Sequence, residues 1–114
     1  MALTRAFKEI VADRAAVDPE FRVALLTEAA DLFLSGDVDT GKAVLRDFIN
    51  ATIGFTRLSD ATGISPKSLM RMLGPDGNPA ARNLFTVFEA LQKAERLTLA
   101  VRAVAGKRDG IEAA

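Results

Sequence analysis

Cations and hydroxyl groups gather on one face of a helix predicted at residues 66–73. Because successive residues of a helix turn by about 100°, Lys67 and Arg71 lie opposite Leu69 and point outward, with Ser68 beside them. Guanidinium, ammonium and hydroxyl groups are donors that proteins use on phosphate oxygens and base edges. The spacing therefore predicts contacts with a nucleic acid. The alternative is an ordinary helical hairpin whose cations are solvated.

The surrounding segment, residues 55–73 with the sequence FTRLSDATGISPKSLMRML, has the spacing of a helix-turn-helix. Ser59 is small where the two helices must cross closely, and Gly63 permits the positive φ that the turn needs. Ser65 then caps the second helix, and Pro66 suits its first position. This geometry lets the second helix project its N-terminal end into a major groove. Apolar residues at helical spacing anchor both helices: Leu58, Ile64, Leu69, Met72 and Leu73.

The residues expected to contact DNA divide by role. We expect Lys67, Ser68 and Arg71 to face bases or phosphates, while backbone N–H groups at the two helix starts meet phosphate oxygens. Asn78 either contacts the DNA backbone or satisfies its own turn through an Asx bond, and Arg82 is either a phosphate clamp or a solvated charge. The complete expected DNA-binding set is Thr56, Arg57, Ser65, Pro66, Lys67, Ser68, Arg71, Asn78 and Arg82.

The composition excludes several classes of chemistry. The 114 residues include no cysteine and no histidine, which removes disulfides, thiolate nucleophiles, Cys/His zinc sites and Ser-His-Asp triads. Ser65 lies near Lys67 but is explained as a helix cap, and Asp37 and Asp39 are typical of turns and caps. The chain also lacks a Walker-type phosphate loop. We therefore expect no enzymatic activity, no catalytic residue, no metal site and no cofactor.

Length and hydropathy indicate one soluble domain. A mass of 12.2 kDa leaves room for a single domain, and 49% hydrophobic with 26% charged residues is a globular composition. No apolar run approaches the roughly 20 residues needed to span a membrane. Charges interrupt the N-terminal segment MALTRAFKEIVADR, which is unlike a signal peptide. We expect a cytoplasmic protein with no membrane partner.

The net charge is zero, but the two halves differ in sign. Residues 1–54 hold 6 basic and 9 acidic side chains, and residues 55–114 hold 9 basic and 6 acidic ones. The basic second half favours an anionic partner. Acidic residues of the first half either attract a basic partner protein or form the solvated face of two helices. They are Asp13, Asp18, Glu20, Glu28 and Asp31.

Apolar periodicity and turn residues predict an all-α domain. A first helix begins at Thr4, and its apolar stripe is Phe7, Ile10, Val11 and Ala15. A second helix follows the cap Asp18 and ends at Gly36. Residues 37–40 are predicted to form a polar turn. Four further helices are then expected at residues 41–52, 56–62, 66–73 and 81–93.

Near the end of the chain the spacing of apolar residues changes from helical to alternating. Leu97, Leu99 and Val101 alternate with polar or small residues, which indicates a strand over residues 97–104. Because a lone strand leaves its backbone groups unpaired, the simplest partner is the same strand of a second copy. The alternative is a frayed helix end or an extended tail lying over the core. The expected organisation is one domain, residues 1–114, made of N-terminal helices (1–36), a helix-turn-helix DNA-binding core (41–93) and this strand.

Residues 41–101 resemble the addiction-module antidote (antitoxin) family of Cro/CI-like helix-turn-helix transcriptional regulators. The resemblance rests on LSDATGISPKSLMRMLGPDGNPAARNLFTVFEAL, in particular TGIS followed by SL, the GPDGNP loop, and LTLAV after the last helix. It implies an all-α Cro/CI-like helix-turn-helix bundle, here with extra N-terminal helices and a short C-terminal β-strand. Ser59 departs from the alanine that is usual at this position in the family.

This resemblance also implies a function. Many such bacterial antitoxins bind double-stranded DNA as homodimers, repress their own promoter and have a neighbouring RelE-like toxin, which is a ribonuclease. We therefore expect a sequence-specific DNA-binding transcriptional regulator that is the antitoxin of a toxin–antitoxin module. The alternative is a protein-interaction module that masks a toxin without significant DNA binding. Steep salt dependence would mark DNA contacts, because phosphate contacts release counterions.

Overall fold

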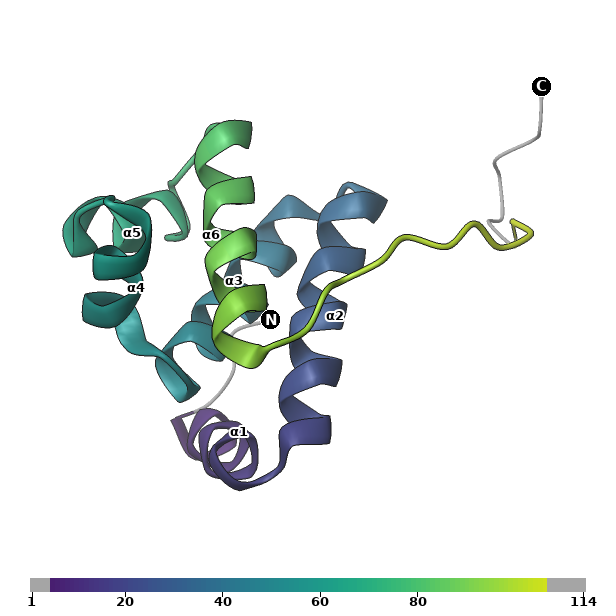
Figure 1. Cartoon of the computed structure of the whole chain (residues 1–114), viewed down its shortest axis with the longest axis horizontal. Coiled ribbons are helices and arrows are strands. Elements are labelled where there is room, and N and C mark those ends of the chain that lie inside the picture. Colours follow the sequence, from purple (N-terminus) through teal and green to yellow (C-terminus); the bar gives the residue numbers. More distant parts are fainter. Residues whose placement is uncertain (1–4, 107–114) are drawn as a thin grey trace.

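Six helices follow one another in the computed structural model, which describes residues 5–106 and the side chains from residue 8 onward. They are α1 (Arg5–Val17), α2 (Pro19–Ser35), α3 (Val38–Ala51), α4 (Gly54–Thr62), α5 (Pro66–Met72) and α6 (Ala81–Glu95) (Figure 1). No strand occurs within residues 5–106, so the predicted all-α class is confirmed. In the same range no helix has the length and apolar content needed to cross a bilayer. The predicted cap Thr4 lies outside the described residues.

Local caps set both ends of α2. Asp18 accepts hydrogen bonds from the backbone N–H groups of Glu20 and Phe21 at 3.1 and 3.2 Å, and Pro19 occupies the first helical position. The helix ends at Gly36, whose φ of 91° is left-handed. Both boundaries agree with the prediction, because each depends on residues within a few positions of the helix end.

The predicted polar turn at residues 37–40 is wrong, because α3 begins there. The Asp37 side chain accepts a hydrogen bond from the backbone N–H of Thr40 at 3.3 Å, so the helix starts at Val38 and not at Gly41. Gly41 therefore lies inside α3, where a Cβ atom would be only 3.1 Å from the ring of Phe33. α2 and α3 pack closely at this point.

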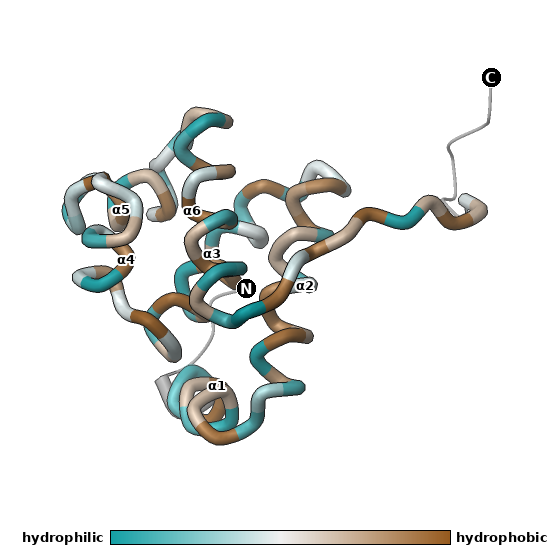
Figure 2. Tube along the Cα trace, viewed as in Figure 1, coloured by the Kyte–Doolittle hydropathy of each residue, from teal (hydrophilic) through white to brown (hydrophobic). Residues whose placement is uncertain are grey.

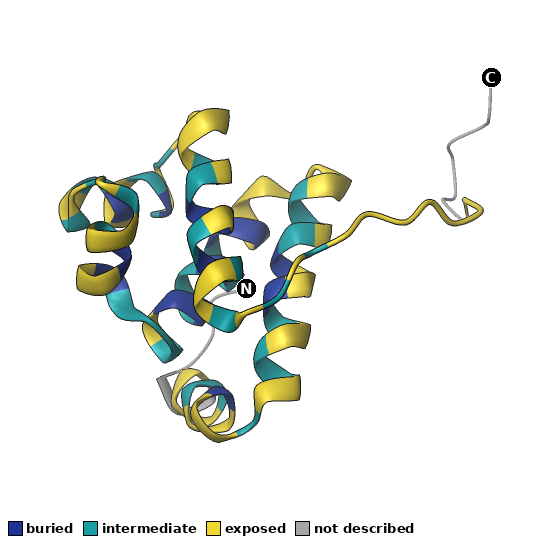
Figure 3. Cartoon of the chain, in the orientation of Figure 1, coloured by how far each residue is buried: buried dark blue, intermediate teal, exposed yellow. Residues whose placement is uncertain are grey.

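The five helices from α2 through α6 share one hydrophobic core. Its largest fully buried side chains are Leu26, Leu45, Phe48, Ile49, Leu58, Leu69, Leu73, Val87 and Leu91. Figure 3 shows the buried segments on the inward faces of these helices, and Figure 2 shows apolar and hydrophilic residues alternating along them. α1 buries Ala15, whereas Ile10, which was predicted to be buried, is exposed. α1 therefore adds little to the core.

Arg22 of α2 forms hydrogen bonds with both α1 and α6. Its Nη1 donates a hydrogen bond to the carbonyl oxygen of Ala15 at 2.8 Å, and its Nε donates to Oε1 of Glu95 at 3.0 Å. Both charged side chains are mostly buried, so salt screens this ion pair less than it would a surface pair. The last turn of α1 and the end of α6 are thereby held at one edge of α2.

Residues 97–106 form a C-terminal arm that contains neither helix nor strand. Leu97 and Leu99 pack against the core, and the backbone N–H of Leu99 donates a hydrogen bond to Oε1 of Gln92 at 2.7 Å. From Ala100 onward every described residue is exposed, and the arm runs out across α2 (Figures 1 and 3). The predicted strand at residues 97–104 is therefore not confirmed in the single chain. The first residues of the arm match the alternative, a tail lying over the core.

The cap of α2 predicts a pH dependence of stability. The hydrogen bond from Nε of Arg14 at 2.9 Å, followed by that from the N–H of Phe21, holds the pKa of Asp18 below its ordinary value of 3.8. The unfolded chain therefore takes up this proton at a higher pH than the folded chain does. The stability that the carboxylate contributes is present above about pH 4 and is lost as the pH falls through the lowered pKa.

We expect Asp18→Asn to flatten the acid limb of the stability profile, because the substituted side chain no longer titrates. The measurement is the free energy of urea unfolding between pH 6 and pH 2. Asp13→Asn removes a negative charge from an exposed position of α1 and is the matched control. Parallel profiles for Asp18→Asn and the unmodified chain would contradict the assignment.

Candidate nucleic-acid interface

A left-handed glycine sets the turn between α4 and α5. Gly63 has a φ of 76°, and its backbone N–H donates a hydrogen bond to the carbonyl oxygen of Ser59 at 2.8 Å. A residue with a Cβ would be strained in this conformation. Ile64 follows and packs partly buried against the core. The turn residues predicted from the sequence therefore occupy the turn, and α5 starts directly after them.

Two serines are committed to the start of α5. The Oγ of Ser65 accepts a hydrogen bond from the backbone N–H of Ser68 at 3.1 Å and donates to its Oγ at 2.9 Å. Pro66 takes the first helical position, as predicted. Ser65 is thus a helix cap, and the hydroxyl of Ser68 already has one partner within the protein.

The two cations of α5 point away from the protein. Leu69 and Leu73 are fully buried and fix the rotation of this short helix about its axis. Lys67 and Arg71 are consequently exposed, and neither forms an ion pair with any side chain between residues 8 and 106. Met70, which is also exposed, lies between them in sequence. The outward orientation that the helical spacing predicted is the one observed.

A groove joins the exposed side of α5 to the loop that follows it. Its lining includes Ser68 and Arg71 of α5, Asn78 of the loop and Asn83 of the first turn of α6. The carboxylate-bearing Asp76 lines the same groove. A guanidinium and two amides are therefore available beside α5, next to an acidic side chain that reduces the positive charge of the groove.

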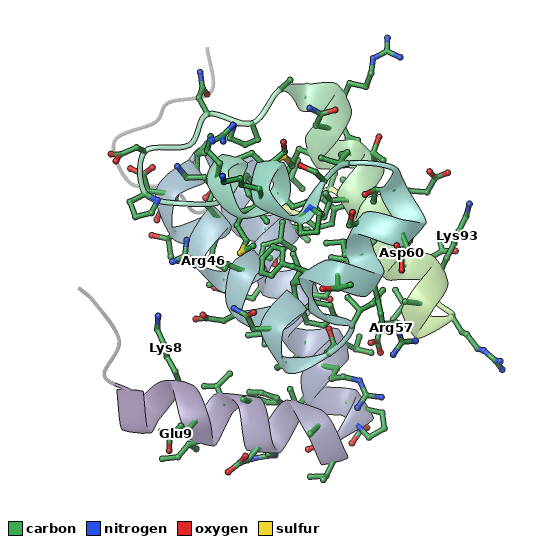
Figure 4. All side chains as sticks on the ribbon, turned by 90° about the vertical axis from the view of Figure 1, so that its left-hand side faces the viewer. Lys8, Glu9, Arg46, Arg57, Asp60 and Lys93 are labelled. Atoms are coloured by element: carbon green, nitrogen blue, oxygen red, sulfur yellow. The ribbon has the colours of Figure 1, made fainter. Side chains whose placement is uncertain are left out.

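The other predicted site residues lie elsewhere. Arg57 lines a separate cleft with Arg22 and Arg96, near the end of α6. Figure 4 shows Arg57 on the side of this face where Lys93 lies, with Arg46 on the opposite side. Thr56 and Arg82 are exposed on the first turns of α4 and α6. The structure thus brings Ser68, Arg71 and Asn78 together and places Arg57 apart from them.

A buried lysine of α3 holds the loop beneath this groove. Lys42 is 3% exposed, and its Nζ donates hydrogen bonds to the carbonyl oxygens of Gly77 at 2.7 Å and Pro75 at 3.4 Å. Oδ1 of Asp39 lies 3.4 Å from the same nitrogen. Two of the three donors of the ammonium group therefore bond to backbone carbonyl oxygens, and the carboxylate of Asp39 adds an ion pair. The charge is therefore compensated although the side chain is buried.

Arg46, also on α3, donates a hydrogen bond at the C-terminal end of α5. Its Nη1 donates a hydrogen bond to the carbonyl oxygen of Leu73, the C-cap residue that follows α5. Cations stabilise the C-terminal end of a helix, where unpaired carbonyl groups carry partial negative charge. Lys42 and Arg46 lie one turn apart on α3, so a single helix supports both the end of α5 and the loop after it.

Gly77 allows the loop after α5 to lie directly against the end of that helix. A Cβ atom there would overlap the backbone carbonyl oxygens of Arg71 and Met72. The loop therefore approaches α5 more closely than any side chain would allow. This contact and the lysine bond act on the same residue and fix the path of the loop toward Asn78.

The sequence patterns used above do not single out Lys42 and Arg46. One signal was available: Lys42 lies three residues before Leu45 and seven before Ile49, on the buried stripe of α3. A lysine in a stripe of this kind is buried only when it has partners.

No family model, curated protein or solved structure matches the chain in the comparisons with known proteins. Within the described residues, no group of three acidic side chains is placed to hold a metal ion.

We expect Lys42→Met to destabilise the protein by about 1–3 kcal/mol, because it keeps the length of the side chain but leaves the carbonyl oxygens of Gly77 and Pro75 without their donor. The measurement is urea unfolding, together with hydrogen exchange at residues 74–79. Lys93→Met is the matched control, since that lysine is exposed and pairs only with Glu89 at the surface. Its expected effect is within about 0.5 kcal/mol. Equal small effects at both positions would contradict the role assigned to Lys42.

Proposed function

We propose that this protein is a sequence-specific DNA-binding transcriptional regulator in which α4 and α5 form a Cro/CI-like helix-turn-helix. The observation that carries the proposal is the exposed face of α5. Lys67 and Arg71 project from it without an ion-pair partner in the described chain, while Leu69 and Leu73 anchor the opposite side. Guanidinium and ammonium groups held in this way fit guanine edges and phosphates in a major groove.

The groove beside α5 supports the same function. Arg71, Ser68 and Asn78 line it, so a guanidinium, a hydroxyl and an amide are within reach of one duplex segment. Amide and guanidinium groups can each form two hydrogen bonds with a base edge, which gives sequence preference. We assign Lys67 mainly to phosphate contacts, because a flexible point charge positions a protein without reading bases.

The charge of the chain argues for binding by two copies. The net charge is zero, and Asp76 places a carboxylate in the groove, so one copy gains little from non-specific attraction. A homodimer provides a second recognition helix, about 34 Å from the first on a pseudo-palindromic site. The second contact then takes place at high effective concentration.

We also propose a biological setting, which rests on the family resemblance alone. The regulator would be the cytoplasmic antitoxin of a toxin–antitoxin module, repressing its own promoter, with a RelE-like toxin as partner. The competing function is toxin masking without significant DNA binding. Selection of duplexes from a randomised pool separates the two, because only the regulator enriches a defined sequence.

On a duplex enriched in this way, Arg71→Ala is expected to weaken binding by about 1–3 kcal/mol, which corresponds to roughly 5- to 150-fold in Kd. It should also relax the preference at one base position. Lys93→Ala, an exposed lysine of α6 outside the groove, is the control and should bind as the unmodified protein does. Titrations by fluorescence anisotropy give both values. Unchanged binding by Arg71→Ala would remove this residue from the reading face.

Lys67→Ala is expected to change the salt dependence of DNA binding and not its sequence preference. Loss of one phosphate contact should reduce the slope of log K against log salt by about 1 per protomer, with the same loss on all duplex sequences. The measurement is the binding constant on the enriched duplex and on a scrambled one between about 50 and 200 mM salt. A slope equal to that of the unmodified protein would show that Lys67 does not contact phosphate.

A further inference from the structure

The turn after α5 is held on both sides of Asp76. The backbone N–H of Gly77 donates a hydrogen bond to the carbonyl oxygen of Gly74 at 3.0 Å, which closes a four-residue turn. Lys42 donates to the carbonyl oxygens of the residues directly before and after Asp76. Loop residues are commonly mobile, because few contacts order their neighbours. Asp76 differs, since it is exposed but both of its chain neighbours are bonded to one buried cation.

The carboxylate of Asp76 has no ion-pair partner within the described protein. Asp76 lines the same groove as Arg71, yet it pairs neither with Arg71 nor with any other side chain between residues 8 and 106. Other carboxylates of the chain have structural roles, since that of Asp18 caps α2 and that of Asp37 caps α3. The acceptor oxygens of Asp76 are therefore available to a ligand that enters the groove.

A carboxylate held in this groove restricts which part of a duplex can lie against it. It repels phosphate oxygens, and in the major groove guanine and thymine present only acceptors as their polar groups. Cytosine presents the N4 amino group, which is a donor. Adenine presents an amino group next to the N7 acceptor, so a carboxylate suits it less well than an amide does. Cytosine is therefore the base whose edge complements Asp76.

We propose that Asp76 is a specificity-determining residue that accepts a hydrogen bond from the N4 amino group of a cytosine. The inference rests on the proposed function of α5 and names a base that the groove selects. Arg71 lines the same groove and has the donors that guanine O6 and N7 require, so the two side chains together match a segment that contains guanine and cytosine. Where cytosine is absent, the carboxylate faces acceptors or phosphates and weakens binding.

Asp76→Ala is expected to change two affinities in opposite directions. The duplex enriched by the unmodified protein should bind about 5- to 150-fold more weakly, the effect of one mismatched base pair. A scrambled duplex should bind about 2- to 5-fold more tightly, because a repelling charge has been removed. Fluorescence anisotropy at about 0.1 M salt gives both values.

Asp60→Ala is the matched control for the loss of one negative charge. Asp60 is an exposed carboxylate of α4 that does not line the groove (Figure 4), and its removal should change neither affinity by more than about twofold. Hydrogen exchange at residues 74–79 should stay unchanged in Asp76→Ala, because Lys42 and not the carboxylate holds the turn. Equal weakening on both duplexes, or faster exchange of the turn, would show a structural role and overturn the proposal.

Selection from a randomised pool with Asp76→Asn tests the base assignment. An amide pairs with the N6 and N7 positions of adenine, so the enriched sequence should change from cytosine to adenine at one position and stay the same elsewhere. If the unmodified protein enriches a defined sequence and Asp76→Asn enriches the same one, the role of Asp76 is overturned and the proposed function stands. If the unmodified protein enriches no sequence, the proposed function fails and this inference fails with it.

Discussion

The arrangement around α5 depends on one buried cation. α5 has seven residues, which is too short to be stable as an isolated helix. The core holds its inner face through Leu69 and Leu73, and the loop after it is tied to α3 by Lys42. Without that ammonium group the carbonyl oxygens of Gly77 and Pro75 would lose a hydrogen-bond donor. The loop that lines the groove beside α5 is therefore held by a lysine from a distant part of the sequence.

Two surfaces of different character lie on the two sides of α6. On one side, α5 and the following loop present cations and amides with little net charge. On the other side, a mostly apolar groove is lined by α2, α6 and the arm and by no ionisable side chain of the described chain, and the loop residues Asn78 and Pro79 line both grooves.

The sequence predicts the parts of this fold that depend on near neighbours. The cap Asp18, the stop Gly36 and the Gly63 turn each involve residues within four positions, and all three are observed. The role of Lys42 could not be predicted, because the carbonyl groups to which it donates lie more than 30 residues away. The separation of Arg57 from Arg71 likewise depends on how α4 packs against α6. The strand predicted at residues 97–104 is not observed, because these residues have no strand to pair with among residues 5–106.

We propose that the exposed face of α5 meets duplex DNA. Backbone amide chemical shifts, followed by nuclear magnetic resonance while an enriched duplex is added, test this contact most directly. Binding through α5 predicts the largest shifts at residues 65–71 and at Asn78, with small shifts on α1. Shifts confined to α1 and α2, or no saturable shifts with any duplex, would contradict it.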